Sequence, residues 1–178
     1  MQIVYVNACE LPVEVLDGKF DLAFIRPVNA ASNSDKFFTD GLNVGDPSNI
    51  LNLGELVNFT DWRKDAPLNS FANNLSYYKY YGVTSINCED IKKVETNWAG
   101  KRQTLEEAFG TELARKIITV KSKTIAPDGT TLPDYGTVTY IKTSGAEIKA
   151  YELYIPLTIT YKWGTIKETI TVQVKATK

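Results

Sequence analysis

The C-terminal part of the chain alternates strictly between apolar and polar residues, and this pattern restricts the fold more than any other feature. From Tyr151 to Tyr161 every second residue is apolar, and the alternation resumes from Ile166 to Val174, broken only by Glu168. A period of two residues is typical of a β-strand with one buried face. We therefore predict two long neighbouring strands at the end of the chain.

These two strands are expected to form a hairpin, because only a few residues separate them. Trp163-Gly164 fits a two-residue loop, and with that loop inward-facing apolar residues of the two strands lie opposite one another. The predicted pairs are Tyr161 with Ile166, Leu157 with Ile170, and Ile155 with Val172.

Other segments carry similar patterns. A second hairpin is predicted over residues 11–24 around the turn Asp17-Gly18, and further strands are predicted over 78–87, 117–125 and 137–143. One short helix is predicted over 104–117, because Thr104 and Glu107 form a capping box, although Gly110 weakens it. Pro12 and Pro156 face outward, which suits an edge strand or a bulge.

Composition limits both the size of the fold and its chemistry. The 178 residues fit a single domain spanning 1–178, and a net charge of −1 gives no field that attracts nucleic acid. No segment has the run of about 20 apolar residues that a membrane span needs. The chain has no histidine, which excludes Ser-His-Asp and Cys-His catalysis and histidine metal sites. We expect no cofactor, no metal and no catalytic residue.

The N-terminus and the two cysteines bear on cellular location. Met1 leads directly into a strand-like segment without a signal peptide, which suggests a processed or recombinant form of a longer protein. Cys9 and Cys88 permit one disulfide, but both lie in apolar, strand-like surroundings, which favours two buried thiols.

The segment 29–74 is rich in Asn, Asp, Ser and Gly, and such a long loop is often functional. Within it, Trp62 between Asp61 and Arg63 could stack on a sugar ring, or Trp62 could instead fill the core while its neighbours pair. Further along, Tyr78 and Tyr80 share one face of a predicted strand, and an exposed face would suit ligand or partner binding. We take these five residues as the candidate ligand-binding site.

Two further chemistries are possible but less favoured. Paired carboxylates could form a glycosidase site, and the candidates are Glu55, Asp61, Glu89 and Asp90. The segment 40–46 carries oxygen ligands for calcium but lacks the closing glutamate of an EF-hand, so ordinary turn chemistry explains it better.

Several short motifs are similar to a known group of proteins. The hairpin 154–165, together with 24–27, 60–63 and 80–84, resembles segments of uncharacterised secreted or cell-surface proteins of Bacteroidetes bacteria. The resemblance implies an extracellular immunoglobulin-like module at the end of a longer polypeptide. It implies no catalytic residues.

The predicted fold is all-β, an immunoglobulin-like two-layer β-sandwich with one short helix. The leading functional hypothesis is a non-catalytic extracellular or cell-surface module that mediates adhesion or assembly, with a protein or glycan as partner. The alternatives are a carbohydrate-binding module that uses exposed aromatic residues and a carboxylate-dependent glycoside hydrolase.

Overall fold

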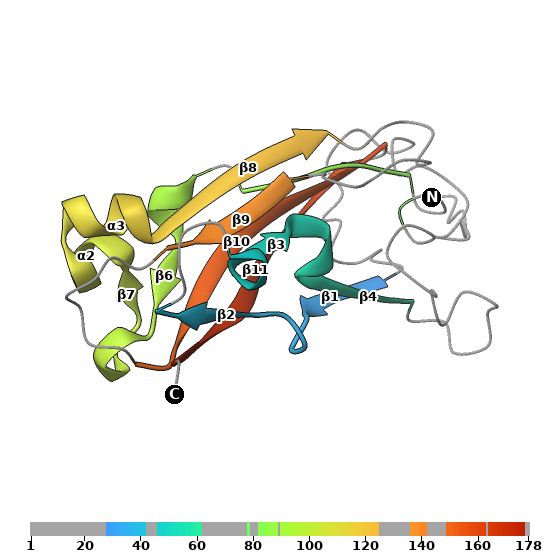
Figure 1. Cartoon of the computed structure of the whole chain (residues 1–178). Coiled ribbons are helices and arrows are strands. Elements are labelled where there is room, and N and C mark those ends of the chain that lie inside the picture. Colours follow the sequence, from blue (N-terminus) through green and yellow to red (C-terminus); the bar gives the residue numbers. More distant parts are fainter. Residues whose placement is uncertain are drawn as a thin grey trace, which may run out of the picture.

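The fold is all-β and sandwich-like, as predicted (Figure 1). The computed structural model describes residues 28–41, 46–61, 78, 82–88, 90–124, 136–141, 149–162 and 164–176. Its strands are β1 (Val28–Ser32), β2 (Phe37–Asp40), β3 (Ile50–Asn52), β4 (Val57–Asp61), β5 (Val83–Asn87), β6 (Glu95–Thr96), β7 (Gln103–Thr104), β8 (Ile118–Thr124), β9 (Gly136–Tyr140), β10 (Tyr151–Tyr161) and β11 (Gly164–Ala176). Its helical segments are η3 (Pro47–Asn49), η4 (Leu53–Glu55), η5 (Ile91–Lys93), η6 (Trp98–Gly100), α2 (Leu105–Phe109) and α3 (Thr111–Ile117).

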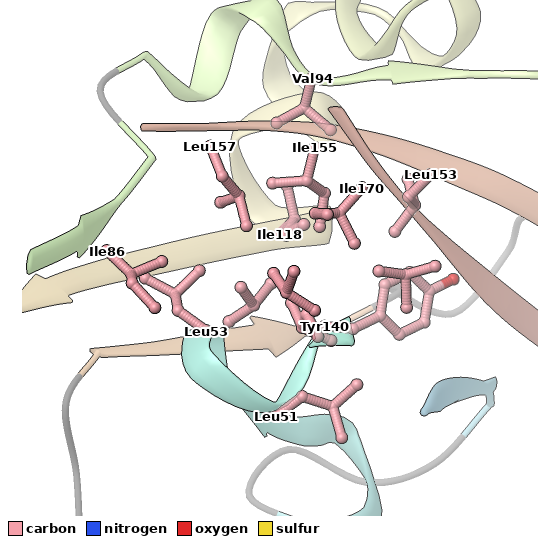
Figure 2. Close-up of a cluster of buried hydrophobic side chains, with 14 of the residues drawn as sticks. Leu51, Leu53, Ile86, Val94, Ile118, Tyr140, Leu153, Ile155, Leu157 and Ile170 are labelled. Carbon is pink, nitrogen blue, oxygen red and sulfur yellow. The ribbon is translucent and has the colours of Figure 1, made fainter. Parts of the chain in front are cut away.

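One long sheet supplies both layers of the sandwich. Its order is β2-β11-β10-β5-β8-β9-β3, while β6 and β7 extend beside β10, and β1 pairs separately with β4. Figure 2 shows that Leu153, Ile155 and Leu157 of β10 point toward the layer formed by β8, β9, β3 and η4. The apolar face that the alternation predicts is therefore the core face.

The C-terminal hairpin is confirmed, but its register differs by two residues from the prediction. Tyr161 lies opposite Gly164 rather than Ile166, and the following pairs shift with it, so that Leu157 faces Glu168. A shift of two residues keeps every side chain on its predicted face, so alternation alone does not distinguish the two registers. The Lys162 N–H donates to the Gly82 carbonyl (3.1 Å), so Lys162 belongs to the turn rather than the ladder.

The other predictions have mixed outcomes. β8 and β9 confirm the strands predicted over 117–125 and 137–143. β5 begins only at Val83, and Tyr78 has helical backbone geometry, so the predicted strand was too long. The hairpin predicted over 11–24 lies outside the described residues.

The predicted helix is present but divided into α2 and α3. Its capping box is confirmed, because the Thr104 hydroxyl accepts the Glu107 N–H (3.2 Å) and the Glu107 carboxylate accepts the Thr104 N–H (2.8 Å). Gly110, at φ 77° and ψ 156°, breaks the helix, because this backbone conformation is accessible almost only to glycine.

A few buried polar groups are hydrogen-bonded inside the apolar core. Asp40 accepts the Tyr140 hydroxyl (3.0 Å), which also lies 2.7 Å from the Tyr151 hydroxyl. At the edge of the sheet, Asn49 bonds both the N–H (2.8 Å) and the carbonyl (2.9 Å) of Thr39 in β2. The Asn49 amide thus takes the place of a neighbouring strand and protects this edge from open-ended pairing.

Candidate functional site

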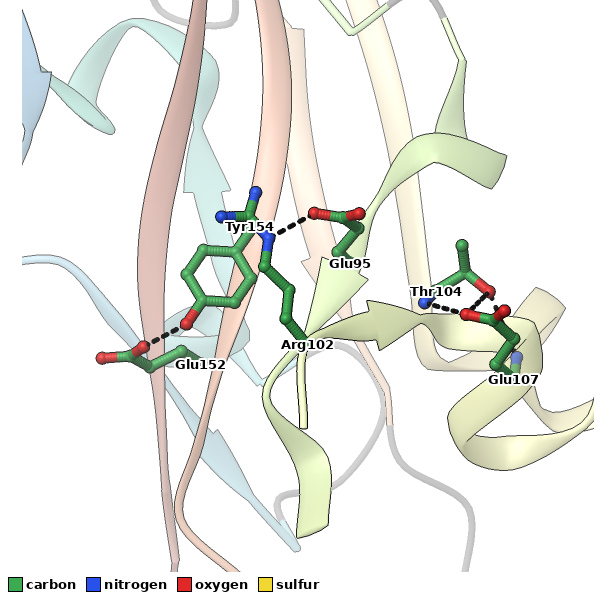
Figure 3. A network of polar contacts seen from close by, with 6 residues as sticks. All are labelled: Glu95, Arg102, Thr104, Glu107, Glu152 and Tyr154. Atoms are coloured by element: carbon green, nitrogen blue, oxygen red, sulfur yellow. Dashed lines mark hydrogen bonds and ion pairs between the residues drawn. The ribbon is translucent and has the colours of Figure 1, made fainter. Parts of the chain in front are cut away.

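The outer face of β10 carries a group of partly exposed polar side chains that are joined by hydrogen bonds and an ion pair. Alternation places Glu152, Tyr154 and Pro156 on the face opposite the core. β6 lies beside this part of β10, with Glu95 opposite Tyr154, and β7 follows at the end of the short loop that carries Arg102. Together, Glu95, Arg102, Glu152 and Tyr154 form what we call the outer-face network (Figure 3).

An arginine stacked on a tyrosine forms the centre of this network. The Arg102 guanidinium carbon lies 4.4 Å from the centroid of the Tyr154 ring, and Arg102 Nε donates to Glu95 Oε2 at 2.5 Å. The side chain of Arg102 is 58% exposed, so this is a surface pair. The ion pair holds the guanidinium over the ring, and a lysine, which lacks a planar donor group, could not reproduce both contacts.

Three donors hold the carboxylate of Glu152 in place. The Tyr154 hydroxyl (2.6 Å) and Asn97 Nδ2 (3.1 Å) donate to Oε2, and Gln173 Nε2 (2.6 Å) donates to Oε1. The hydrogen bond to Glu152 raises the pKa of the Tyr154 phenol, so the hydroxyl remains a donor at neutral pH. Side chains that are fixed in this way lose little further entropy on binding a partner.

A break in strand pairing adjoins the network at Pro156. β10 pairs with β6 at Leu153 and Tyr154, and with β5 only from Thr158 onward. The Glu152 carbonyl accepts the Asn97 N–H (3.3 Å), which shows that even-numbered residues of β10 direct their backbone groups away from β11. The Pro156 nitrogen therefore faces the break. Proline has no N–H to donate, so β10 can be a central strand here, whereas the sequence suggested an edge strand or a bulge.

The break opens into a groove of about 490 Å³ with charges of both signs. Its charged side chains are Asp90, Lys93 and Lys167, while Glu168 lies opposite the buried Leu157 and turns its side chain toward the core face. Asp90 already serves the fold, because its carboxylate caps η5 by accepting the Lys92 N–H (3.0 Å). The chemistry of this groove is that of a charged recognition surface next to the outer-face network.

Only one side chain of the sequence-predicted site is described. Trp62, Arg63 and Tyr80 lie outside the described residues, and Asp61 is described only as the last residue of β4. Tyr78 is 2% exposed and its hydroxyl donates to the Gly54 carbonyl (2.8 Å). Its predicted place on an exposed strand face is therefore wrong, and its ring is part of the core.

Among the carboxylates considered for catalysis or calcium binding, those described make contacts within the fold, while Glu89 and the side chain of Asp61 lie outside the described residues. Glu55, the last residue of η4, forms an ion pair with Lys36 (3.4 Å). Asp90 lies at the start of η5, in a different segment of the chain. Asp46 accepts the backbone N–H (3.0 Å) and hydroxyl (2.6 Å) of Ser48, as ordinary turn chemistry predicts, and these bonds lower its pKa. Where side chains are described, no group of three potential metal ligands occurs.

Two remaining features concern the cysteines and the membrane. Cys88 is half-buried against the core, but Cys9 lies outside the described residues, so the possible disulfide stays a prediction. None of the helices among the described residues has the length and apolar character needed to span a membrane.

Sequence reasoning missed the outer-face network, although part of it was detectable. Tyr154 is an aromatic residue at an outward position of a strongly alternating strand, which is unusual if it only contacts water. Arg102 lies in a short loop and Glu95 in the two-residue strand β6, and no pattern predicts that they meet Tyr154.

Comparison with known protein families, with curated proteins and with solved structures finds no significant match. Functional inference for this chain therefore depends on its own geometry.

Proposed function

We propose that this chain is a non-catalytic module of the cell surface or extracellular space that mediates adhesion or assembly. We further propose that the outer face of β10 is its binding surface. The observation that carries the proposal is the Arg102–Tyr154 stack, held by Glu95 and Glu152. Arginine and tyrosine are enriched at the energetic centres of protein interfaces.

The surroundings of the stack support a protein partner. Lys93 and Lys167 lie in the adjoining groove with Asp90, so the surface carries charges of both signs. Such mixed charge fixes the orientation of a protein partner and rejects others through like-charge repulsion. The immunoglobulin-like architecture implied by the resemblance is consistent with this role and belongs to the same proposal.

A carbohydrate is the second candidate partner. An aromatic ring beside a carboxylate and two amides is the combination that could stack on a sugar ring and bind its hydroxyls, and Tyr154, Glu152, Asn97 and Gln173 supply it. This candidate uses the same face of β10, so one set of variants tests both partners.

The test compares self-association with glycan binding. The chain is analysed by sedimentation at increasing concentration and is also applied to a glycan array. Tyr154→Ala probes the outer-face network and Trp62→Ala probes the site predicted from sequence, while Thr165→Ala on the same face at the hairpin end is the control. Loss of either interaction in Tyr154→Ala alone supports the proposal. An interaction lost only in Trp62→Ala would contradict it, as would a wild-type chain that neither self-associates nor binds any glycan.

A further inference from the structure

A second break in pairing leaves one edge of β8 open. β9 pairs with β8 from Ile118 to Ser122, whereas β5 pairs only with Lys123 and Thr124. After Asn87 the chain leaves the sheet and continues into η5 (Figure 1). Within the described part of the chain, β8 therefore has no strand partner on its β5 side between Ile118 and Ser122.

The backbone of β8 directs hydrogen-bonding groups toward this open edge. The Ile141 N–H donates to the Ile117 carbonyl (2.6 Å), which makes the odd-numbered residues the ones that bond to β9. The N–H and carbonyl of Val120 consequently point away from β9. Val120 is half-buried, so a partner that pairs with it would also remove apolar surface from water.

A groove of about 290 Å³ lies along this edge. η5 forms one wall and α2 and α3 form another; the apolar lining consists of Ile91, Leu105, Ala114, Ile118 and Val120. Ile91 is 38% exposed at the rim, which is unusual for a large aliphatic side chain. The groove thus combines an unpaired strand edge with an apolar surface.

The charges at the rim indicate the character of an occupant. Lys92 and Arg115 are basic and Glu106 is the one acidic residue of the lining. Arg115 is paired with Glu112 only at 3.8 Å on an exposed surface, and such a pair exchanges readily with another carboxylate. An acidic residue flanked by apolar residues would complement this rim.

We propose that the β8 groove binds an extended peptide segment of a partner protein, which adds to β8 as a further strand. The segment pairs with the backbone of Val120, inserts apolar side chains against Ile118 and Leu105, and directs an acidic residue to Lys92 or Arg115. This is recognition by strand addition, in which main-chain bonds supply affinity and alternate side chains supply specificity. The groove is distinct from the outer-face network, so the two sites are tested separately.

The experiment uses the intact chain and short labelled peptides in which valine alternates with threonine and glutamate. Binding is followed by fluorescence anisotropy, and a matched peptide carries lysine in place of glutamate. Val120→Pro removes the N–H on the open edge and retains the ladder to β9, while Lys92→Glu with Arg115→Glu reverses the rim charge. Circular dichroism confirms that each variant is folded, and Ile91→Glu replaces Val120→Pro if the proline variant is not.

The proposal expects saturable binding of the acidic peptide and at least about a tenfold loss of affinity in Val120→Pro or Ile91→Glu. The charge-reversed variant should prefer the lysine peptide, and Thr165→Ala, which lies outside the groove lining, should bind like the wild type. The proposal is overturned if no peptide saturates at about 1 mM, or if folded Val120→Pro and Ile91→Glu both bind normally. Wild-type self-association that both variants abolish would instead assign the groove to a second copy of this chain.

Discussion

Replacing Asn49 by alanine should destabilise the protein through the edge strand β2. The Asn49 side chain is 2% exposed and makes two hydrogen bonds to the backbone of Thr39. Each such bond contributes about 1 kcal/mol net, and Thr39 is half-buried, so water replaces the lost partners only in part. We expect the free energy of unfolding to fall by about 2 kcal/mol, which corresponds to about 4–8 °C in Tm for a chain of this size.

Urea denaturation followed by tryptophan fluorescence measures this loss. Asn52→Ala is the matched control, because it makes the same chemical change at a residue whose side chain makes no capping hydrogen bond. A loss for Asn49→Ala below about 0.5 kcal/mol, or one equal to that of Asn52→Ala, would refute the reasoning.

Replacing Asn49 by aspartate tests the accepting and the donating hydrogen bond of this side chain separately. The aspartate keeps the acceptor for the Thr39 N–H but directs a second oxygen at the Thr39 carbonyl, where only the protonated carboxyl can donate. Its pKa in the folded state should therefore exceed the unfolded value of about 3.9. The deficit relative to the wild type should be largest above the folded pKa and should shrink as the pH falls through it.

Three further predictions concern the core and the helices. Burial raises the pKa of Tyr140 and Tyr151 above the unfolded value of about 10, so unfolding becomes easier as the pH rises beyond that value. Tyr140→Phe should lower the free energy of unfolding by about 1–2 kcal/mol at neutral pH. Above about pH 10 the free energy of unfolding should fall less steeply with pH than in the wild type, and an unchanged slope in urea denaturation would contradict this. Gly110→Ala should lower the free energy of unfolding by about 1–3 kcal/mol in the same assay, because alanine is strained in this backbone conformation. The added methyl group meets no atom within 4 Å, so a steric clash does not contribute, and a neutral effect would argue against the strained conformation. Thr104→Ala should cost about 1 kcal/mol. The Thr104 N–H holds the pKa of Glu107 low and remains in the variant, but loss of the hydroxyl, which also donates to this carboxylate, should raise the pKa in part; carboxyl NMR titration checks this, and an unmoved pKa would contradict the hydroxyl bond to Glu107.

The sequence predicted the fold where local pattern and tertiary contacts act together. The alternation in β10 and β11 predicted which side chains face the core, since one buried face is enough to produce it. It did not predict the register, because pairings that differ by two residues bury the same faces. The capping box at Thr104 was predictable because its bonds lie within one turn of helix.

The candidate site was harder to predict because it depends on contacts between distant segments. Tyr78 resembled a strand residue, but burial of its ring and a bond to Gly54 override the local pattern. The Arg102–Tyr154 stack joins a loop residue to a strand 52 positions later in the numbering, and no spacing rule anticipates such a contact. Both grooves arise where β5 leaves the sheet after Asn87, which a sequence pattern does not mark.

The most direct test of the central claim is a double-mutant cycle between Arg102→Ala and Tyr154→Ala. The measured quantity is the affinity of the soluble chain for an immobilised copy of itself or for an immobilised glycan. If the stacked pair forms the centre of the binding surface, each single variant should lose nearly as much affinity as the double variant, while Thr165→Ala binds normally. Single variants that leave the affinity unchanged would contradict the claim that the outer face of β10 is the binding surface.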